Sequence, residues 1–271
     1  MDCSLELPDV IIHKIMDYLP TKAVVRSCVL LSSPKLGEEL SLHRVEIVLG
    51  DVQDIDVLDF EMLSELAPGW MKLALDVGVK VLAVYIGSND FLPILYFPNC
   101  SSKALTCLKV AGFIFDQSFS SILGNFESLG ELILCNCEIK DYPVLELPSC
   151  FPLLENLAII YCFGFESVSV SASNIPSVKN LKVLAWGYET HSISIEIPAP
   201  TLEILCLRGK TISLPAFHNL TFLLLYDTEK KISCIVSELP VLENLTLIWF
   251  KCEVLKISSQ QLQNLILSDP D

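Results

Sequence analysis

The sequence predicts an α/β solenoid: a curved parallel sheet of stacked repeats with a strand- and loop-rich convex side, preceded by a short helical segment. Three observations predict it. A leucine pattern recurs every 18 to 27 residues over the last two thirds of the chain. Strand-length apolar runs alternate with proline-containing turns. Helical spacing of apolar residues is confined to the first part of the chain.

The recurring pattern is Leu-x-x-Leu-x-Leu, clearest at Leu202, Leu205 and Leu207. We read nine units, which are Val79-Leu82-Val84, Leu105-Leu108-Val110, Leu129-Leu132-Leu134, Leu154-Leu157-Ile159, Leu181-Leu184-Trp186, Leu202-Leu205-Leu207, Leu220-Leu223-Leu225, Leu242-Leu245-Leu247 and Leu262-Leu265-Leu267. Self-similarity at this period is typical of leucine-rich repeats. In each unit the last three positions put two apolar side chains on one face of a short strand, and stacked units bury these faces in one core.

The segments between the units predict the convex side. Residues 167–171, 192–197 and 253–257 alternate with a period of two, and prolines punctuate the turns around them. We therefore expect short strands and loops, with few helices, behind the main sheet.

The first 78 residues predict helices and one strand. Residues 5–31 fit two helices, the first ending at Pro20 and the second running from Lys22 to Leu31. Residues 42–49 alternate as in a strand, and residues 51–67 fit an acidic helix. Pro68 fits the first turn of a further helix that ends near Gly78 and covers the open end of the core.

Composition excludes several function classes. The mean hydropathy is +0.52, yet no apolar run approaches the roughly 18 residues that a membrane span needs. A net charge of −15 disfavours nucleic acid. The first residues lack the basic region of a signal peptide, and eleven cysteines without a CxxC pair indicate a reducing compartment, the cytoplasm or nucleus. A secreted receptor fragment is disfavoured for the same reasons.

The residues between and after the leucines are expected on the concave side of the sheet, where a target protein would bind. The expected target-binding residues are Tyr85, Lys109, Glu131, Ile133, Ile160, Arg208, Phe222, Leu224, Tyr226 and Ile248. In the unit that starts at Leu181, the same rule selects Val183, Ala185 and Gly187. Because this surface is so apolar, we expect it to bind an apolar segment of a partner, with the contact centred on Phe222, Leu224 and Tyr226. The alternatives are a further C-terminal segment or self-association, since no polar capping segment follows the last unit before Asp271.

No catalytic or metal site is predicted. The four histidines fall on different elements, and no nucleotide-binding, hydrolase or zinc-protease motif is present. Cys137 and Cys162 occupy the Asn/Cys position of their repeats, where a small polar group satisfies loop amides; metal ligation, the alternative, lacks a second pair at ligand spacing. Cys135, two residues before Cys137, is a weak redox or metal candidate. The acidic residues 51–61 do not match a calcium-binding loop. We expect no enzyme activity, no cofactor and no metal.

The first 30 residues carry a family resemblance. The runs LPDVIIHKI (7–15), YLPTK (18–22) and VVRSCVL (24–30) closely resemble the start of plant F-box/leucine-rich-repeat proteins. The third, tryptophan-containing helix of such F-boxes is missing, because the next tryptophan is Trp70. The resemblance divides the chain into a partial F-box (1–31), a linker with capping helices (32–78) and the repeats (79–271).

The same resemblance implies a function. Such proteins are non-enzymatic substrate-recognition adaptors of SCF-type (Skp1-cullin-F-box) E3 ubiquitin ligases. The residues that would contact the Skp1-like adaptor or form the F-box core are Leu7, Pro8, Ile11, Ile15, Leu19, Pro20 and Val24. The alternative is a leucine-rich-repeat interaction scaffold with no role in ubiquitination.

Overall fold

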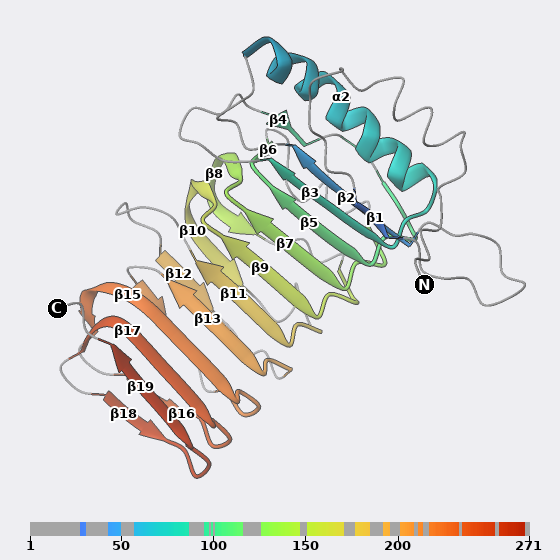
Figure 1. The fold of residues 1–271 in the computed structure, drawn as a ribbon. Helices are drawn as coiled ribbons and strands as arrows, with labels where there is room; N and C mark the ends of the chain where they lie inside the picture. Colours follow the sequence, from blue (N-terminus) through green and yellow to red (C-terminus); the bar gives the residue numbers. More distant parts are fainter. Residues whose placement is uncertain are drawn as a thin grey trace, which may run out of the picture.

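A computed structural model describes the protein at residues 28–30, 43–49, 57–86, 95–97, 99, 101–115, 126–146, 151–170, 177–184, 192–195, 201–208, 211–213, 217–232, 235–252 and 255–268. The described strands form one long stack that runs from the N-terminal to the C-terminal end of the molecule (Figure 1). This is the solenoid that the leucine spacing predicts.

The main sheet has eleven strands in the order β1-β2-β3-β5-β7-β9-β11-β13-β15-β17-β19. The bounds are β1 Cys28–Leu30, β2 Arg44–Leu49, β3 Val81–Ile86, β5 Cys107–Ala111, β7 Glu131–Cys135, β9 Asn156–Ile160, β11 Asn180–Leu184, β13 Ile204–Arg208, β15 Phe222–Ile232, β17 Asn244–Cys252 and β19 Asn264–Ser268. Neighbours from β2 to β19 pair parallel and in register, so that Leu132 aligns with Leu108 on one side and Leu157 on the other. Equivalent residues of all repeats therefore form straight columns across the sheet.

A second layer of strands lies behind the main sheet and confirms the predicted strand-rich convex side. One six-stranded sheet runs in the order β14-β12-β10-β8-β6-β4, and β16 pairs with β18. The bounds are β4 Leu95–Tyr96, β6 Phe113–Phe115, β8 Glu138–Glu146, β10 Phe163–Val170, β12 Ser192–Ile195, β14 Thr211–Ser213, β16 Ile235–Glu238 and β18 Leu255–Ser258. The predicted segments 167–171, 192–197 and 253–257 correspond to parts of β10, β12 and β18.

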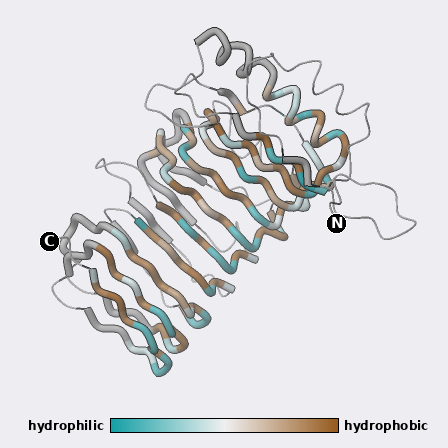
Figure 2. Tube along the Cα trace, in the orientation of Figure 1, coloured by the Kyte–Doolittle hydropathy of each residue, from teal (hydrophilic) through white to brown (hydrophobic). Residues whose placement is uncertain are grey.

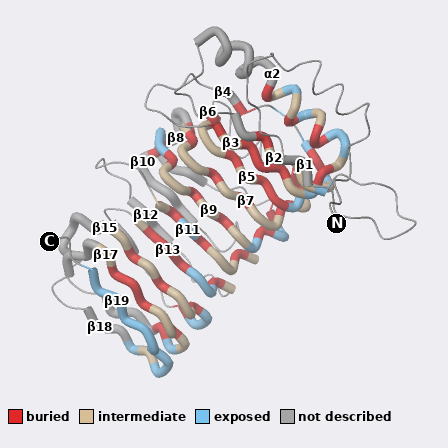
Figure 3. The backbone as a smooth tube through the Cα atoms, viewed as in Figure 1, coloured by how far each residue is buried: buried red, intermediate tan, exposed pale blue. Residues whose placement is uncertain are grey.

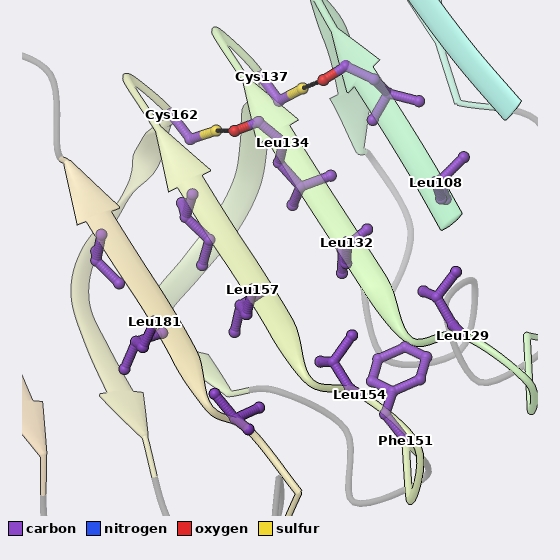
Figure 4. Close-up of a cluster of buried hydrophobic side chains, with 14 of the residues drawn as sticks. Leu108, Leu129, Leu132, Leu134, Cys137, Phe151, Leu154, Leu157, Cys162 and Leu181 are labelled. Carbon is purple, nitrogen blue, oxygen red and sulfur yellow. Dashed lines mark hydrogen bonds between the residues drawn. The ribbon is translucent and has the colours of Figure 1, made fainter. Parts of the chain in front are cut away.

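The core lies between these two layers and is built from the leucine columns. Leu129, Leu132 and Leu134 are fully buried, and Phe151 packs with them beside Leu154 and Leu157 of the next repeat (Figure 4). In β7 and β9, buried and half-buried residues alternate strictly, as a strand with one face in a core requires (Figure 3). Burial of each such side chain stabilises the fold by about 1.5–3 kcal/mol.

Each repeat begins with the same backbone connection to its predecessor. The carbonyl of Lys80 accepts hydrogen bonds from the amides of Thr106 (2.8 Å) and Cys107 (3.0 Å). One repeat later, the carbonyl of Thr106 accepts from Gly130 and Glu131 in the same way. The pattern continues to the carbonyl of Glu243, which accepts hydrogen bonds from the amides of Gln263 and Asn264, where β19 begins. These bonds satisfy the backbone where the chain enters each strand, and they hold the repeats in register.

The chain leaves three successive strands through a residue with positive φ. These are Gly112 (φ 80°), Asn136 (φ 48°) and Tyr161 (φ 55°). Each lies two residues after the second core-facing residue of its strand. The left-handed turn directs the next residue, Cys137 or Cys162, back into the core. A glycine and an asparagine are usual in this conformation, whereas a tyrosine is uncommon.

The predicted register of one repeat is wrong. Leu181 aligns with Leu157 and Leu205, and Val183 aligns with Ile159 and Leu207. The unit therefore starts at Val178, which is buried, and not at Leu181. Val178 thus occupies the first core position of this repeat. Leu184, which we predicted in the core, lies on the opposite face of the strand. Val183, which we expected on the concave side, is instead fully buried in the core.

The N-terminal elements differ from the prediction in two respects. Residues 28–30, assigned to a helix, form β1, which pairs antiparallel with β2 and satisfies the edge of the sheet that β2 would otherwise leave open. The helix predicted to break at Pro68 is one continuous helix, α2 (Val57–Asp76), with Pro68 inside it. The rest of the two predicted helices within residues 5–31 lies outside the described residues.

The strand predicted over residues 42–49 is confirmed as β2, and it belongs to the main sheet, because it pairs parallel with β3. The sheet thus begins before residue 79. Helix α2 follows β2 in sequence and lies at the N-terminal end of the stack (Figure 1). It contributes Ala67, Met71, Ala74 and Leu75 to the core. This contribution is the covering role that we expected for a helix at this end.

Candidate protein-binding face

The main sheet has one face in the core and one face directed away from the second layer, which we call the open face. Each strand contributes a segment of five residues that aligns with its neighbours, and we number the resulting columns one to five. The open face consists of the first, third and fifth columns. All ten predicted target-binding residues lie on it and are half-buried, and they are Tyr85, Lys109, Glu131, Ile133, Ile160, Arg208, Phe222, Leu224, Tyr226 and Ile248. Their placement agrees with the predicted face, while their role in binding stays a prediction.

The N-terminal part of the open face carries charges that pair with each other. Arg44 and Glu46 form an ion pair at 2.8 Å, and Lys109 and Glu131 form another at 3.1 Å. Because these pairs are partly exposed, each contributes at most about 1 kcal/mol to stability. Their main effect is to neutralise this part of the face.

Cys107 extends the Lys109–Glu131 pair. Its thiol donates to Glu131 Oε2 at 3.0 Å. Burial, followed by this hydrogen bond, raises the pKa of Cys107 to about 12, so the thiol is protonated at neutral pH and is a poor nucleophile. Burial alone would raise the pKa of Glu131, but hydrogen bonds from Cys107 and Lys109 lower it below its ordinary value. The cluster is a structural network with no nucleophile.

Apolar side chains of the open face gather on β15 and at the adjacent end of β17. Phe222, Leu224 and Tyr226 follow one another on β15, and Ile248 lies beside Tyr226 on β17. Arg208 of β13 lies on the other side of Tyr226, with its guanidinium carbon 4.8 Å from the centre of the tyrosine ring. This cation–π contact holds the guanidinium against the apolar surface. We call Arg208, Phe222, Leu224, Tyr226 and Ile248 the apolar patch.

Several small side chains of the open face are almost fully covered. Ala83, Cys107, Cys206 and Thr246 belong to it but are at most 9% exposed, because larger neighbours in adjacent columns cover them. Cys206 lies between Lys182 and Leu224 in the third column. Of these four residues, Cys206 and Thr246 lie beside Leu224, so small and largely covered side chains flank the apolar patch.

Lys182 is a residue of the open face that the sequence prediction missed. It is exposed in the third column of β11, next to Cys206, and is a diagonal neighbour of Arg208. The register error at Leu181 had placed Lys182 outside the face. The repeated dipeptide Asn-Leu was the available signal, because Asn180-Leu181 corresponds to Asn156-Leu157.

Two asparagine pairs connect strands on the same face. The side-chain amide of Asn180 donates to Asn156 Oδ1, and that of Asn264 donates to Asn244 Oδ1 at 2.7 Å. The sequence analysis missed Asn180 and both pairings. Each pair links neighbouring strands through side chains as well as backbone, which strengthens the register.

Cys137 and Cys162 are structural, as predicted, although their partners differ from the expectation. Both are fully buried, and each thiol can donate to a carbonyl of the preceding repeat (Figure 4) or to one of its own strand. For Cys137 these are Val110 O at 3.8 Å and Cys135 O at 3.2 Å, and for Cys162 they are Leu134 O and Ile160 O, both at 3.6 Å. We expected them to satisfy loop amides, but a thiol in this position acts as the donor. Burial raises the pKa of Cys162.

Other predicted features lie partly outside the described residues. The adaptor-facing residues Leu7, Pro8, Ile11, Ile15, Leu19, Pro20 and Val24 all fall in the undescribed N-terminal stretch, so their role stays a prediction. Within the described part of the chain, no group of three potential metal ligands comes together. Among those residues, too, no helix is long and apolar enough to cross a bilayer.

Comparison with known proteins identifies the repeats. The family described as "FBD-associated F-box protein At5g56370, LRR repeats" matches residues 67–215, which is more than half of the chain and spans α2 to β14. No solved structure matches.

Individual relatives agree with this family. The F-box/LRR-repeat protein At5g02910 of Arabidopsis thaliana is 25% identical over 64% of this chain and 42% of its own length. The putative F-box/LRR-repeat proteins At5g02700 and At3g28410 of the same plant are each 25% identical over 56% of this chain, covering 37% and 36% of their lengths. The chain thus spans less than half the length of these relatives. With its in-register leucine columns and this family match, the chain belongs to the leucine-rich repeats of plant FBD-associated F-box proteins.

Proposed function

We propose that the protein is a substrate-recognition adaptor of an SCF-type E3 ubiquitin ligase in the cytoplasm or nucleus. In this role the N-terminal residues around Leu7 and Leu19 hold a Skp1-like adaptor of the cullin complex, and the open face holds the target protein. The observation that carries the proposal is the apolar patch on a face of the sheet that the second layer leaves uncovered. The F-box names of the relatives supply the connection to ubiquitination.

Charge on the open face favours a particular kind of target segment. Its described side chains include four cations, Arg44, Lys109, Lys182 and Arg208, but only the anions Glu46 and Glu131. The two anions pair with Arg44 and Lys109. In a chain with a net charge of −15, Lys182 and Arg208 bring two cationic groups to the edge of the apolar patch.

The target segment follows from this arrangement. The patch spans β13 to β17, two strand spacings or about 10 Å, which three or four residues of an extended peptide cross. Apolar side chains of the target would pack on Phe222 and Leu224, and a carboxylate would lie near Lys182 and Arg208. Such a segment gains from burial of apolar area and from a charge-assisted hydrogen bond.

Two experiments test the two halves of the proposal. For the adaptor, the purified chain is captured on an immobilised Skp1-like protein, with Leu7→Asp and Leu19→Asp as controls. We expect retention of the unchanged chain and loss of both variants. No retention of the unchanged chain would remove the ligase role and leave an interaction scaffold, the alternative that the repeat family alone also supports.

For the target face, plant extract is passed over the unchanged chain and over Leu224→Glu and Tyr226→Glu variants. Leu153→Glu is the matched control, since Leu153 is 57% exposed in the turn before β9, away from the open face. Proteins bound through the patch are retained by Leu153→Glu and lost from both patch variants, with at least a tenfold reduction. Equal capture by all four chains contradicts target binding at the patch, whatever the adaptor experiment gives.

A further inference from the structure

One cation of the open face has no anionic partner within the described part of the chain. Lys182, in the third column of β11, is exposed, and no ion pair joins it to a described carboxylate. Lys109, in the same column of β5, instead pairs with Glu131 at 3.1 Å. The charge of Lys182 is therefore available to a binding partner, whereas that of Lys109 is already neutralised.

Small side chains lie on both sides of Lys182 along its column. Ala158 of β9 precedes it, and Cys206 of β13 follows it. Ala158 is half-buried, whereas Ala83, the alanine in the same column of β3, is fully buried. The surface at Ala158 is thus accessible, and a partner side chain that lies on it comes to rest beside Lys182.

An amide pair adds hydrogen-bond donors next to this surface. Asn156 and Asn180 occupy the first column of the same two strands, two residues before Ala158 and Lys182. The side-chain amide of Asn180 donates one hydrogen bond to Asn156 Oδ1. Because a side-chain amide carries two N–H groups, the other N–H of Asn180 remains for a ligand. An ammonium group beside an amide donor is a combination that suits a carboxylate, which accepts at both of its oxygens.

The hydropathy of the strands changes directly after this pair. Strand β11 alternates between polar and apolar residues, whereas β13 is apolar along most of its length (Figure 2). Ile204 of β13 and Phe222 of β15 follow Asn180 in the first column, and Ile204 is 38% exposed.

Strand spacing relates the polar and the apolar positions. Neighbouring strands lie about 4.8 Å apart, so the midpoint between Ile204 and Phe222 is about 7 Å from Asn180. Side chains two residues apart on an extended chain face the same way and are also roughly 7 Å apart. An extended segment that crosses the strands therefore places one side chain at Lys182 and the next but one on Ile204 and Phe222.

We propose that Lys182 and Asn180 bind the side-chain carboxylate of an Asp or Glu residue in the target segment. The Lys182 ammonium donates to one carboxylate oxygen, and the remaining N–H of Asn180 donates to the other. An apolar side chain two residues away in the target packs on Ile204 and Phe222. Charge complementarity selects a carboxylate here, because the ammonium of Lys182 repels a basic side chain. The inference rests on the proposed binding of a target at the open face, and it adds the spacing of an acidic and an apolar residue.

Peptide selection tests this spacing directly. Random heptapeptides displayed on phage are selected on the full 271-residue chain and, in parallel, on Lys182→Met, Lys182→Glu and Lys179→Met. Lys179→Met is the matched control, since it removes the same charge from a residue that precedes β11 and pairs with Glu155 at 2.9 Å. The unchanged chain and Lys179→Met should enrich an acidic residue two positions from a leucine, isoleucine or phenylalanine. Lys182→Met should lose the acidic residue, and Lys182→Glu should select lysine or arginine in its place.

A synthetic peptide from the selection on the unchanged chain then gives affinities by fluorescence anisotropy. Lys182→Met should weaken its binding roughly tenfold or more, as loss of a charge-assisted hydrogen bond does, and Lys179→Met should leave it unchanged. Acidic residues that persist in the Lys182→Met selection, or no acidic enrichment on the unchanged chain, overturn the inference.

The Leu224→Glu variant separates this inference from the proposed function. A peptide that Leu224→Glu fails to bind but Lys182→Met still binds at full affinity overturns the carboxylate contact and leaves target binding at the apolar patch intact. A peptide that needs Lys182 but binds Leu224→Glu unchanged supports the carboxylate contact and counts against the patch.

Discussion

Replacing Gly164 by alanine should weaken the fold more than any other glycine substitution among the described residues. Gly164 has φ +90° in β10, at the point where the register between β10 and β8 shifts. An added Cβ would lie 2.5 Å from the carbonyl oxygen of Ile139 and 3.0 Å from its carbonyl carbon. Ile139 is fully buried in β8, so its backbone has little room to move.

Two costs add at this position. An L-residue in the left-handed region costs about 1–2 kcal/mol. The overlap with backbone atoms forces β8 and β10 apart, and together we expect a loss of about 2–4 kcal/mol, in the range of severe single substitutions. For a chain of this size such a loss lowers the urea midpoint by roughly 1 M.

The matched control is Gly69→Ala. Gly69 is exposed in α2, and a Cβ there would meet nothing within 4 Å. Alanine in a helix interior is favoured over glycine by about 0.5–1 kcal/mol, so this variant should be more stable than the unchanged chain. The assay is urea unfolding followed by circular dichroism. If Gly164→Ala unfolds at the same urea concentration as the unchanged chain or later, the close approach of β10 to β8 is not as described.

Three further predictions concern the network on and behind the open face. The pKa of Glu131 is lowered from its ordinary 4.5, so the carboxylate stabilises the fold fully above pH 4.5 and loses this effect as the pH falls through the lowered value. The urea midpoint of the unchanged chain, measured between pH 3 and 7, should therefore include this loss at acid pH, and that of Glu131→Gln should lack it. In a double-mutant cycle of Asn156→Ala and Asn180→Ala, unfolding free energies should give a coupling of about 0.5–1.5 kcal/mol, and a value near zero would contradict the hydrogen bond. Cys162→Ala removes a buried thiol and its bond to Leu134 O, which should cost about 1–2 kcal/mol in the same assay, whereas an unchanged midpoint would mean that the thiol bond adds nothing.

The sheet could be predicted from the sequence because its determinants are local and repeated. A leucine pair two residues apart sets both the strand and its inward face, and eight of the nine units agree with the observed columns. The prediction failed for the unit assigned to Leu181, because Val178 replaces the first leucine of that repeat. Leu184 and Leu181 happen to match the spacing of a unit that the structure does not contain. The neighbouring Asn180 carried the information that would have set the register.

The N-terminal elements were predicted less well because tertiary contacts decide them. Cys28-Val29-Leu30 fits a helix or a strand equally in sequence, and the open edge of β2 selects the strand. At Pro68 the local rule predicts a boundary, since proline removes a helical hydrogen bond. The helix continues because Ala67 and Met71, on either side of Pro68, are both fully buried in the same core. In both cases packing outweighs local preference.

The same division separates the columns that the fold requires from those that it leaves free. The fold constrains the second and fourth columns, where Leu132 and Leu134 are fully buried, and the turn position occupied by Cys137. It places no comparable demand on the first, third and fifth columns, whose side chains reach the open face. At 25% identity, three quarters of the aligned residues differ between this chain and its relative At5g02910. Under the proposed function, the choice of target depends on residues of these three columns, such as Lys182, Arg208 and Phe222.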